Sequence, residues 1–142
     1  MIKIHPNILI GSPPELQQVL PSVNFIINCS MNLNNLIVHP NYINLNISIF
    51  NQETLTYLNN LYNFIVEKIC SNQNIFLLCE TGINNSLIIG MFIIMKMFNL
   101  NYNQVYYTIA NSHRINSYDF YTGLKFYEIH IISNFSENMD LT

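Results

Sequence analysis

Cys79 is the residue of this 142-residue chain whose surroundings are best suited to chemistry. It follows four apolar residues, and Gly82 and Ser86 come just before a long apolar run. A strand that ends in cysteine, a short glycine loop and a hydroxyl residue that opens a helix together form a cradle for an anion, because loop N–H groups and the helix N-terminus converge there. The same field favours the thiolate, the nucleophilic form of cysteine. This cradle, the Cys79 segment, comprises Cys79, Glu80, Thr81, Gly82, Ile83, Asn84, Asn85 and Ser86.

The elements that must position this segment alternate between strand and helix patterns along the chain. Residues 75–78 are apolar without interruption, as in a central strand that is covered on both faces. The pattern predicts further strands over residues 2–4, 8–10, 25–27 and 45–49, and helices over residues 13–21, 51–70, 87–98, 103–112 and 118–132. This order indicates an α/β fold, a central and mostly parallel sheet of about five strands flanked by helices. Residues 1–132 form the expected domain, and residues 133–142 form a polar tail.

Composition excludes several classes of function. The net charge is −3 with only five Lys and Arg, so the chain lacks the basic face that nucleic acids or anionic membranes require. The three cysteines, Cys29, Cys70 and Cys79, contain no C-x-x-C pair, which favours a reducing compartment over a disulfide framework or a zinc site. The four histidines have no metal-ligand spacing, and no cofactor motif is present. We therefore expect a protein without metal or cofactor.

Three stretches in the right order resemble the cysteine-based dual-specificity phosphatases, whose signature is H-C-x-x-G-x-x-R-S. The Cys79 segment resembles that signature, residues 4–12 resemble the opening I-x-x-x-L-Y-L-G-S, and residues 114–128 resemble the closing segment of the family. The resemblance covers roughly residues 1–130 and implies the phosphatase fold. It also implies that Cys79 occupies the position of the nucleophile and that residues 80–86 form the phosphate-binding loop.

The departures from this family pattern fall on the residues that carry out catalysis. Asn85 stands at the position of the signature arginine, and Leu78 stands at the position of the histidine. The general-acid aspartate aligns best with Ile49, and the only two aspartates, Asp119 and Asp140, both follow the cysteine. The resemblance therefore implies a degenerate, STYX-like pseudophosphatase in which Cys79 is a vestigial nucleophile.

Other interpretations remain open at this level. Cys79 could be a partly active thiolate in an anion-binding loop, with Arg114, Lys96 or Lys125 as a substitute cation and Glu53 as a proton donor. The chain would then be an atypical phosphatase that acts on protein, nucleotide or RNA 5′ phosphates. A structural or dimerisation role with no ligand at the loop is a third interpretation.

The expected role is that of a binding, scaffold or competitor module for phosphorylated or phosphatase-interacting proteins, with a homodimer as a further form.

The 24 Asn and 23 Ile against one Ala indicate an AT-rich genome, which fits a large DNA virus or an AT-rich unicellular eukaryote. Poxviruses encode compact phosphatases of this family, which makes a viral source attractive. The expected location is intracellular, in the cytoplasm, or in the host cytoplasm or virion for a viral protein, because no signal peptide precedes the domain.

Overall fold

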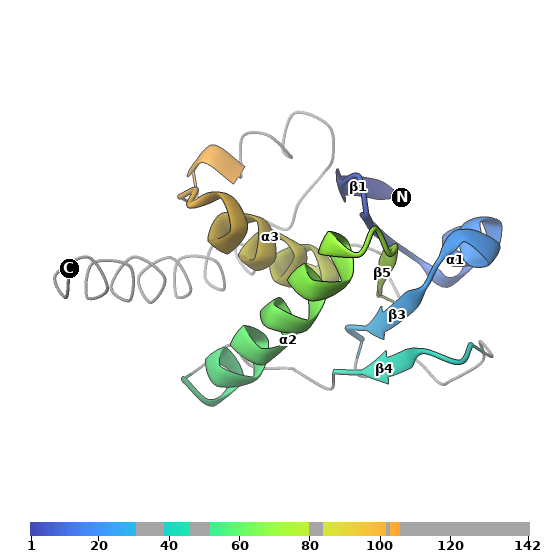
Figure 1. Cartoon of the computed structure of the whole chain (residues 1–142), viewed down its shortest axis with the longest axis horizontal. Helices are drawn as coiled ribbons and strands as arrows, with labels where there is room; N and C mark the ends of the chain where they lie inside the picture. The colour runs from blue at the N-terminus through green and yellow to red at the C-terminus, as the bar shows by residue number, and fades with distance from the viewer. Residues whose placement is uncertain (31–38, 46–51, 80–83, 102, 106–142) are drawn as a thin grey trace, which may run out of the picture.

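A computed structural model of the chain describes residues 1–30, 39–45, 52–79, 84–101 and 103–105 (Figure 1). Five short strands and three α-helices alternate along these residues. The elements are β1 (Ile2–His5), β2 (Ile8–Gly11), α1 (Pro13–Val19), the 3₁₀ turn η1 (Leu20–Ser22), β3 (Phe25–Asn28), β4 (Tyr42–Asn44), α2 (Gln52–Cys70), β5 (Ile75–Leu78) and α3 (Asn84–Phe98).

The strands form one mixed sheet in the order β1-β2-β5-β3-β4. Only the β1–β2 hairpin is antiparallel, and the pairs β2–β5, β3–β5 and β3–β4 are all parallel. The sequence prediction of a mostly parallel, five-stranded sheet flanked by helices is therefore confirmed. The last strand of the described residues, β5, lies at the centre of the sheet, and its two neighbours come from the first thirty residues.

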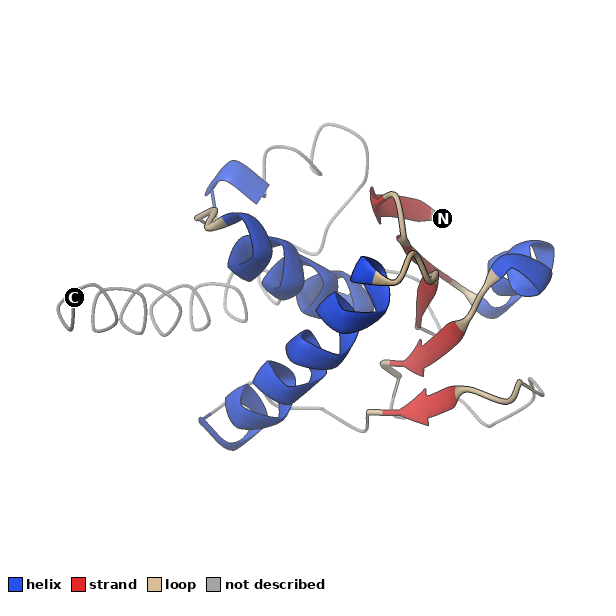
Figure 2. Ribbon diagram, viewed as in Figure 1, coloured by secondary structure: helices blue, strands red, loops and turns tan. Residues whose placement is uncertain are grey.

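The central strand β5 is buried on both faces because each face packs on a different layer of helix. Ile75 and Leu77 belong to a large core with α2 and α3, whereas Phe76 and Leu78 belong to a smaller core with α1 and η1. Figure 2 shows the strands between these two layers, with α2 and α3 on one side and α1 on the other. An uninterrupted apolar run is the sequence pattern that such a strand requires.

Helix α3 is buried on nearly every side over residues 86–95. Gly90 allows this close packing, because a Cβ atom there would lie 2.8 Å from Ile4 Cδ1 and 2.9 Å from Ile10 Cδ1. The backbone of α3 thus rests directly on β1 and β2. Within the described residues, no helix is long and apolar enough to cross a membrane.

The strand next to β3 begins earlier in the sequence than predicted. The sequence predicted a strand over residues 45–49, but the strand that pairs with β3 is Tyr42–Asn44, and Leu45 follows its end. The alternation begins two residues earlier than expected, with Ile43, and the register Ile26↔Tyr42 fixes that position. Residues 46–49 lie outside the described residues.

The predicted helix over residues 103–112 is described only at residues 103–105, which are helical. The predicted helix over residues 118–132 and the predicted tail lie outside the described residues.

The edge of the sheet opposite the carboxyl ends of the parallel strands contains two turns of the same sequence, His-Pro-Asn. His5 Nδ1 accepts a hydrogen bond from the backbone N–H of Asn7, and His39 Nδ1 accepts one from Asn41, both at 3.0 Å. The Asn7 side chain in turn donates to Asn74 Oδ1 at 3.0 Å. An imidazole that accepts at Nδ1 must be unprotonated there, so these turns require neutral histidine.

The His5 turn predicts an acid-sensitive contribution to stability. Burial lowers the pKa of His5 below its ordinary 6.5, so the unfolded chain takes up this proton more readily than the folded chain. The contribution of His5 is therefore complete above about pH 6.5 and is lost as the pH falls toward the lower pKa of the folded state. In His5→Asn the side-chain oxygen keeps the turn hydrogen bond but cannot titrate. Urea unfolding at pH 7 and pH 5.5 should show a smaller loss of stability for His5→Asn than for the wild type, and equal losses would contradict the prediction.

Candidate functional site

Cys79 lies immediately after β5, at the carboxyl edge of the sheet. Its backbone N–H donates to the carbonyl of Gly11, the last residue of β2, at 3.1 Å. This bond continues the parallel ladder by one residue, so the backbone of Cys79 is fixed. The side chain is almost completely buried, at 6% exposure. Ligand sites of open α/β sheets lie beyond this same edge.

The N-terminus of α3 carries a buried hydroxyl that has no partner among the described residues. Ser86 is fully buried, and its Oγ atom makes no hydrogen bond within the described part of the chain. An unsatisfied buried hydroxyl costs about 1–3 kcal/mol, and the unpaired N–H groups of a helix start add positive potential beside it. Asn84 and Asn85 form the first turn of α3, although their side chains lie outside the description, as do residues 80–83.

Leu78 precedes the cysteine and lies in a wholly apolar environment. It is fully buried in the smaller core, with Leu16 and Ile26 among its neighbours. Its side chain points to the α1 face, away from the face that receives Leu77. No hydrogen bond can therefore run from the side chain of this position to the backbone that leads into the Cys79 segment.

Cys29 is a second buried thiol at this edge, and the sequence analysis gave it no role. Its backbone N–H donates to the carbonyl of Leu78 at 2.7 Å, and its Sγ atom donates to the carbonyl of Ile27 at 3.6 Å. Burial raises the pKa of the Cys29 thiol strongly, and the nearby Cys79 raises it further. A signal was present in the sequence, because a cysteine directly follows each of the short strands β3 and β5.

Neutral amides organise the neighbouring strand ends. The buried Asn28 donates from Nδ2 to Asn44 Oδ1 at 3.0 Å, and its Oδ1 accepts the backbone N–H of Ser30 at 3.0 Å. This side chain therefore joins the ends of β3 and β4 and fixes the first residues after β3. The arrangement contributes donors and acceptors to the edge but no charge.

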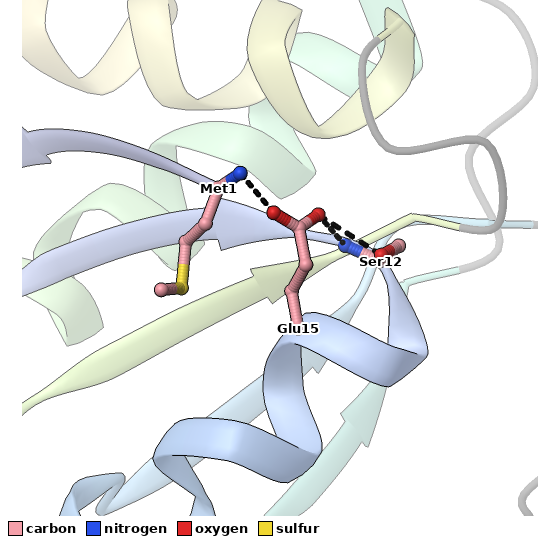
Figure 3. A network of polar contacts seen from close by, with 3 residues as sticks. All are labelled: Met1, Ser12 and Glu15. Carbon is pink, nitrogen blue, oxygen red and sulfur yellow. Dashed lines mark hydrogen bonds and ion pairs between the residues drawn. The ribbon is translucent and has the colours of Figure 1, made fainter.

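Glu15 is a carboxylate close to this edge, but it is already engaged as a helix cap (Figure 3). Its Oε1 accepts hydrogen bonds from the Ser12 backbone N–H at 3.0 Å and the Ser12 hydroxyl at 2.9 Å. Its Oε2 pairs with the amino group of Met1. The amino group first and the Ser12 backbone second lower the pKa of Glu15 to about 2. Glu15 is thus ionised at neutral pH and holds no proton to donate.

The structure separates one predicted substitute cation from the Cys79 segment. Lys96 lies ten residues beyond Ser86, which corresponds to roughly 15 Å of helix. Its Nζ donates to Asn59 Oδ1 at 2.6 Å and lies 4.6 Å from the centroid of the Tyr62 ring on α2. Lys96 therefore serves the α2–α3 contact and does not replace the missing arginine. Arg114 and Lys125 lie outside the described residues, and Glu53 lies in α2 with its side chain undescribed.

The fold is similar to that of several proteins of known structure. DUSP15 superimposes with a TM-score of 0.73 over 90% of this chain and 86% of its own, at 18% identity. Human DUSP28 gives 0.73 over 91% and 93%, at 13% identity. The fold is that of the dual-specificity phosphatases. The human tyrosine phosphatase-like serine/threonine/tyrosine-interacting protein has the same fold, with a TM-score of 0.66 over 92% and 96% at 19% identity.

The match to the dual-specificity phosphatase fold rests on structure alone. No protein-family sequence model matches the chain, and no curated protein is significantly similar to it in sequence. The described residues contain no group of three or more His, Cys, Asp or Glu side chains that could hold a metal ion. The candidate site therefore consists of Cys79, the strand ends around it and the N-terminus of α3.

The unpartnered hydroxyl of Ser86 predicts an unusual mutational result. Ser86→Ala should leave the free energy of unfolding unchanged or raise it by about 1 kcal/mol, because it removes a buried group that gains nothing from the fold. Urea unfolding measures this. Ser22→Ala is a suitable control, since the Ser22 hydroxyl donates to the carbonyl of Val19 at 2.8 Å and its loss should be destabilising. A loss of 1 kcal/mol or more for Ser86→Ala would show that the hydroxyl has a partner.

Proposed function

We propose that this protein is a pseudophosphatase, a catalytically inactive module that binds a phosphorylated protein at the Cys79 segment. The observation that carries the proposal is the combination of Cys79 at the carboxyl end of the central strand with asparagine at position 85, in the first turn of α3. The strand end and the helix start that flank the loop support phosphate binding, whereas Asn85 stands where the resemblance places the arginine that would stabilise a phosphoryl transition state.

The lost arginine is the first of the two losses that would abolish activity. A guanidinium holds two phosphate oxygens at once and stabilises the charge of the transition state, whereas an asparagine amide donates a neutral hydrogen bond. Removal of one such preorganised donor lowers the rate by about 10²–10³-fold. Among the cations of the described chain, Lys96 is committed to α2, so it offers no replacement.

The proton donor is the second loss. A leaving alkoxide needs a general acid, and its absence costs about 10²–10⁴-fold in rate. No aspartate precedes Cys79 in the sequence, and the only glutamates that do are Glu15, Glu53 and Glu67. Glu15 is ionised and forms part of the cap of α1, Glu67 lies near the C-terminus of α2 beside Lys68, and the side chain of Glu53 lies outside the described residues. Both losses together would leave hydrolysis negligible, even with Cys79 as a thiolate.

Binding of a phosphate requires fewer groups than its hydrolysis, and two such groups lie among the described residues. The N-terminus of the 15-residue helix α3 supplies partial positive charge, and the buried Ser86 hydroxyl is a donor without a partner in the described chain. A phosphate oxygen at this position would satisfy that hydroxyl. Charge favours a phosphorylated protein as the partner. A net charge of −3 disfavours nucleic acid, and phosphoserine, phosphothreonine or phosphotyrosine on a protein presents a phosphate dianion.

The first consequence is the absence of phosphatase activity. The 142-residue chain should show no cysteine-dependent hydrolysis of an aryl phosphate, measured beside an active dual-specificity phosphatase at equal concentration. Cys79→Ser is the matched control, because any contaminating activity would survive that substitution. Turnover that Cys79→Ser abolishes would contradict the proposal and support the atypical-enzyme interpretation.

The second consequence concerns affinity for the anion. Asn85→Arg should bind inorganic phosphate or vanadate about 10- to 100-fold more tightly than the wild type, because a charge-assisted bidentate contact contributes about 1.5–3 kcal/mol. Calorimetric titration gives both affinities. Asn84→Arg adds the same charge to the same turn of α3, one position away from the signature arginine, and should improve binding far less.

Equal affinities for the wild type, Asn85→Arg and Asn84→Arg would contradict phosphate binding at this segment and would leave the structural interpretation. Ser86→Ala provides an independent test, since loss of a hydroxyl that contacts the anion should weaken binding without loss of fold stability.

A further inference from the structure

The two edge strands of the sheet differ in how they are protected. The edge strand β1 carries the exposed Lys3 and an irregular register between Lys3 and His5, and an edge lysine and a bulge both hinder pairing with a further strand. The opposite edge strand, β4, consists of Tyr42, Ile43 and Asn44, so it carries neither a charge nor a proline, and its register with β3 is regular. Among the described residues no strand pairs with the outer side of β4 (Figure 1). This edge of the described sheet is therefore open to a further strand.

The main chain of β4 presents a short and symmetric set of groups on its outer side. The Asn41 carbonyl and the Leu45 N–H form hydrogen bonds with β3, at 2.9 Å and 3.0 Å, so the odd-numbered residues of this segment face β3. Successive residues of a strand direct their N–H and C=O groups to opposite edges. The outward groups therefore belong to Tyr42 and Asn44, one residue on each side of Ile43.

An apolar groove lies beside this edge, between β4 and α2. Its volume is about 240 Å³, and the described residues that line it are Ile43, Leu45, Tyr57, Asn60 and Leu61. None of these five side chains carries a charge, and Tyr57 is 49% exposed. A further strand at β4 would pair with the outward main-chain groups and cover this groove at the same time.

We infer that a second copy of this chain occupies this edge, by antiparallel pairing of the two β4 strands around a two-fold axis between their Ile43 residues. In that register the outward groups of Tyr42 meet those of Asn44 in the other copy, and the two such pairs form four main-chain hydrogen bonds. The axis is perpendicular to the sheet, so both α2 helices remain on the same face and the two grooves meet across the paired Ile43 side chains. The inference rests on the sheet edge and does not require phosphate binding at the Cys79 segment.

Charge favours a second copy over a partner of opposite charge. A two-fold interface places the same patch of both copies together, so a charge near the axis would repel its own counterpart. The described residues of β4 and of the groove are neutral, which makes this patch self-complementary and gives it nothing that attracts a charged peptide. Pairing through so short a strand gives a small interface, so the dimer should be weak and should dissociate over the micromolar range.

Sedimentation velocity of the 142-residue chain over a range of concentrations measures this dimer. Tyr57→Lys places a charge at the groove of each copy and should raise the dissociation constant of the dimer by about tenfold or more, because like charges then meet near the axis. Phe98→Lys is the matched control, since Phe98 is an aromatic residue of α3 with 55% exposure and is not among the described residues that line the groove. It makes the same change of charge and should leave the dissociation constant unchanged.

Asn44→Pro tests the main-chain pairing separately from the groove. Proline removes the outward N–H of residue 44, so it deletes two of the four hydrogen bonds between the copies and leaves the main-chain pairing of β3 with β4 intact. The same substitution removes the side-chain hydrogen bond from Asn28 to Asn44. Asn44→Ala loses that side-chain bond but keeps the N–H, and as the matched control it should still dimerise.

The expected result is a reversible dimer for the wild type, Phe98→Lys and Asn44→Ala, and a much weaker dimer for Tyr57→Lys and Asn44→Pro. A wild-type chain that stays monomeric up to millimolar concentration would overturn the inference and leave this edge to a strand of a different protein. A dimer that Tyr57→Lys and Phe98→Lys weaken equally would place the interface elsewhere, and a dimer that Asn44→Pro leaves unchanged would refute the strand pairing. The variants at Tyr57 and Phe98 decide the matter when Asn44→Pro does not fold.

Discussion

The structure depends on the burial of one strand, β5, on all four of its sides. Its two edges are hydrogen-bonded to β2 and β3, and its two faces pack on separate helical layers. Every backbone group of such a strand must be paired within the sheet, because no water reaches it. Its two ends are left for polar groups, and the carboxyl end faces the side of the sheet where ligands bind in open α/β folds. Cys79 occupies that end, and helix α3 returns from it over the same core.

This constraint explains why the fold does not depend on the polar residues around its carboxyl edge. The groups that hold β5 and α3 in place are apolar side chains and main-chain hydrogen bonds, and none of them is a catalytic group. Leu78 illustrates the point, since an apolar side chain at this position adds to the smaller core beside Leu16 and Ile26. Substitution of polar residues around such a scaffold would therefore cost little stability, and an apolar residue such as Leu78 extends the core.

Much of the fold could be predicted from the sequence because its signals are local. Four consecutive apolar residues identify β5, and the Ser12-Pro13-Pro14-Glu15 start of α1 contains the cap that the structure shows. The start of β4 was missed because the alternation of Leu45, Ile47 and Ile49 does not show that pairing with β3 already begins at Tyr42. The Cys29–Cys79 neighbourhood was missed for a different reason: fifty residues separate the two thiols, and only the strand order brings them together. Lys96 was a plausible cation only while its direction on α3 was unknown.

The strand order also has a consequence for synthesis on the ribosome. The hairpin β1–β2 and the pair β3–β4 do not hydrogen-bond to each other, because β5 lies between them. The first seventy residues therefore emerge with the apolar strand edges of Ile8–Gly11 and Phe25–Asn28 unpaired, and the sheet closes only when residues 75–78 leave the exit tunnel. Late closure by a parallel strand is slow, and exposed edges are prone to wrong pairing in the interval. Nascent chains of this protein should consequently depend on chaperones until β5 is inserted.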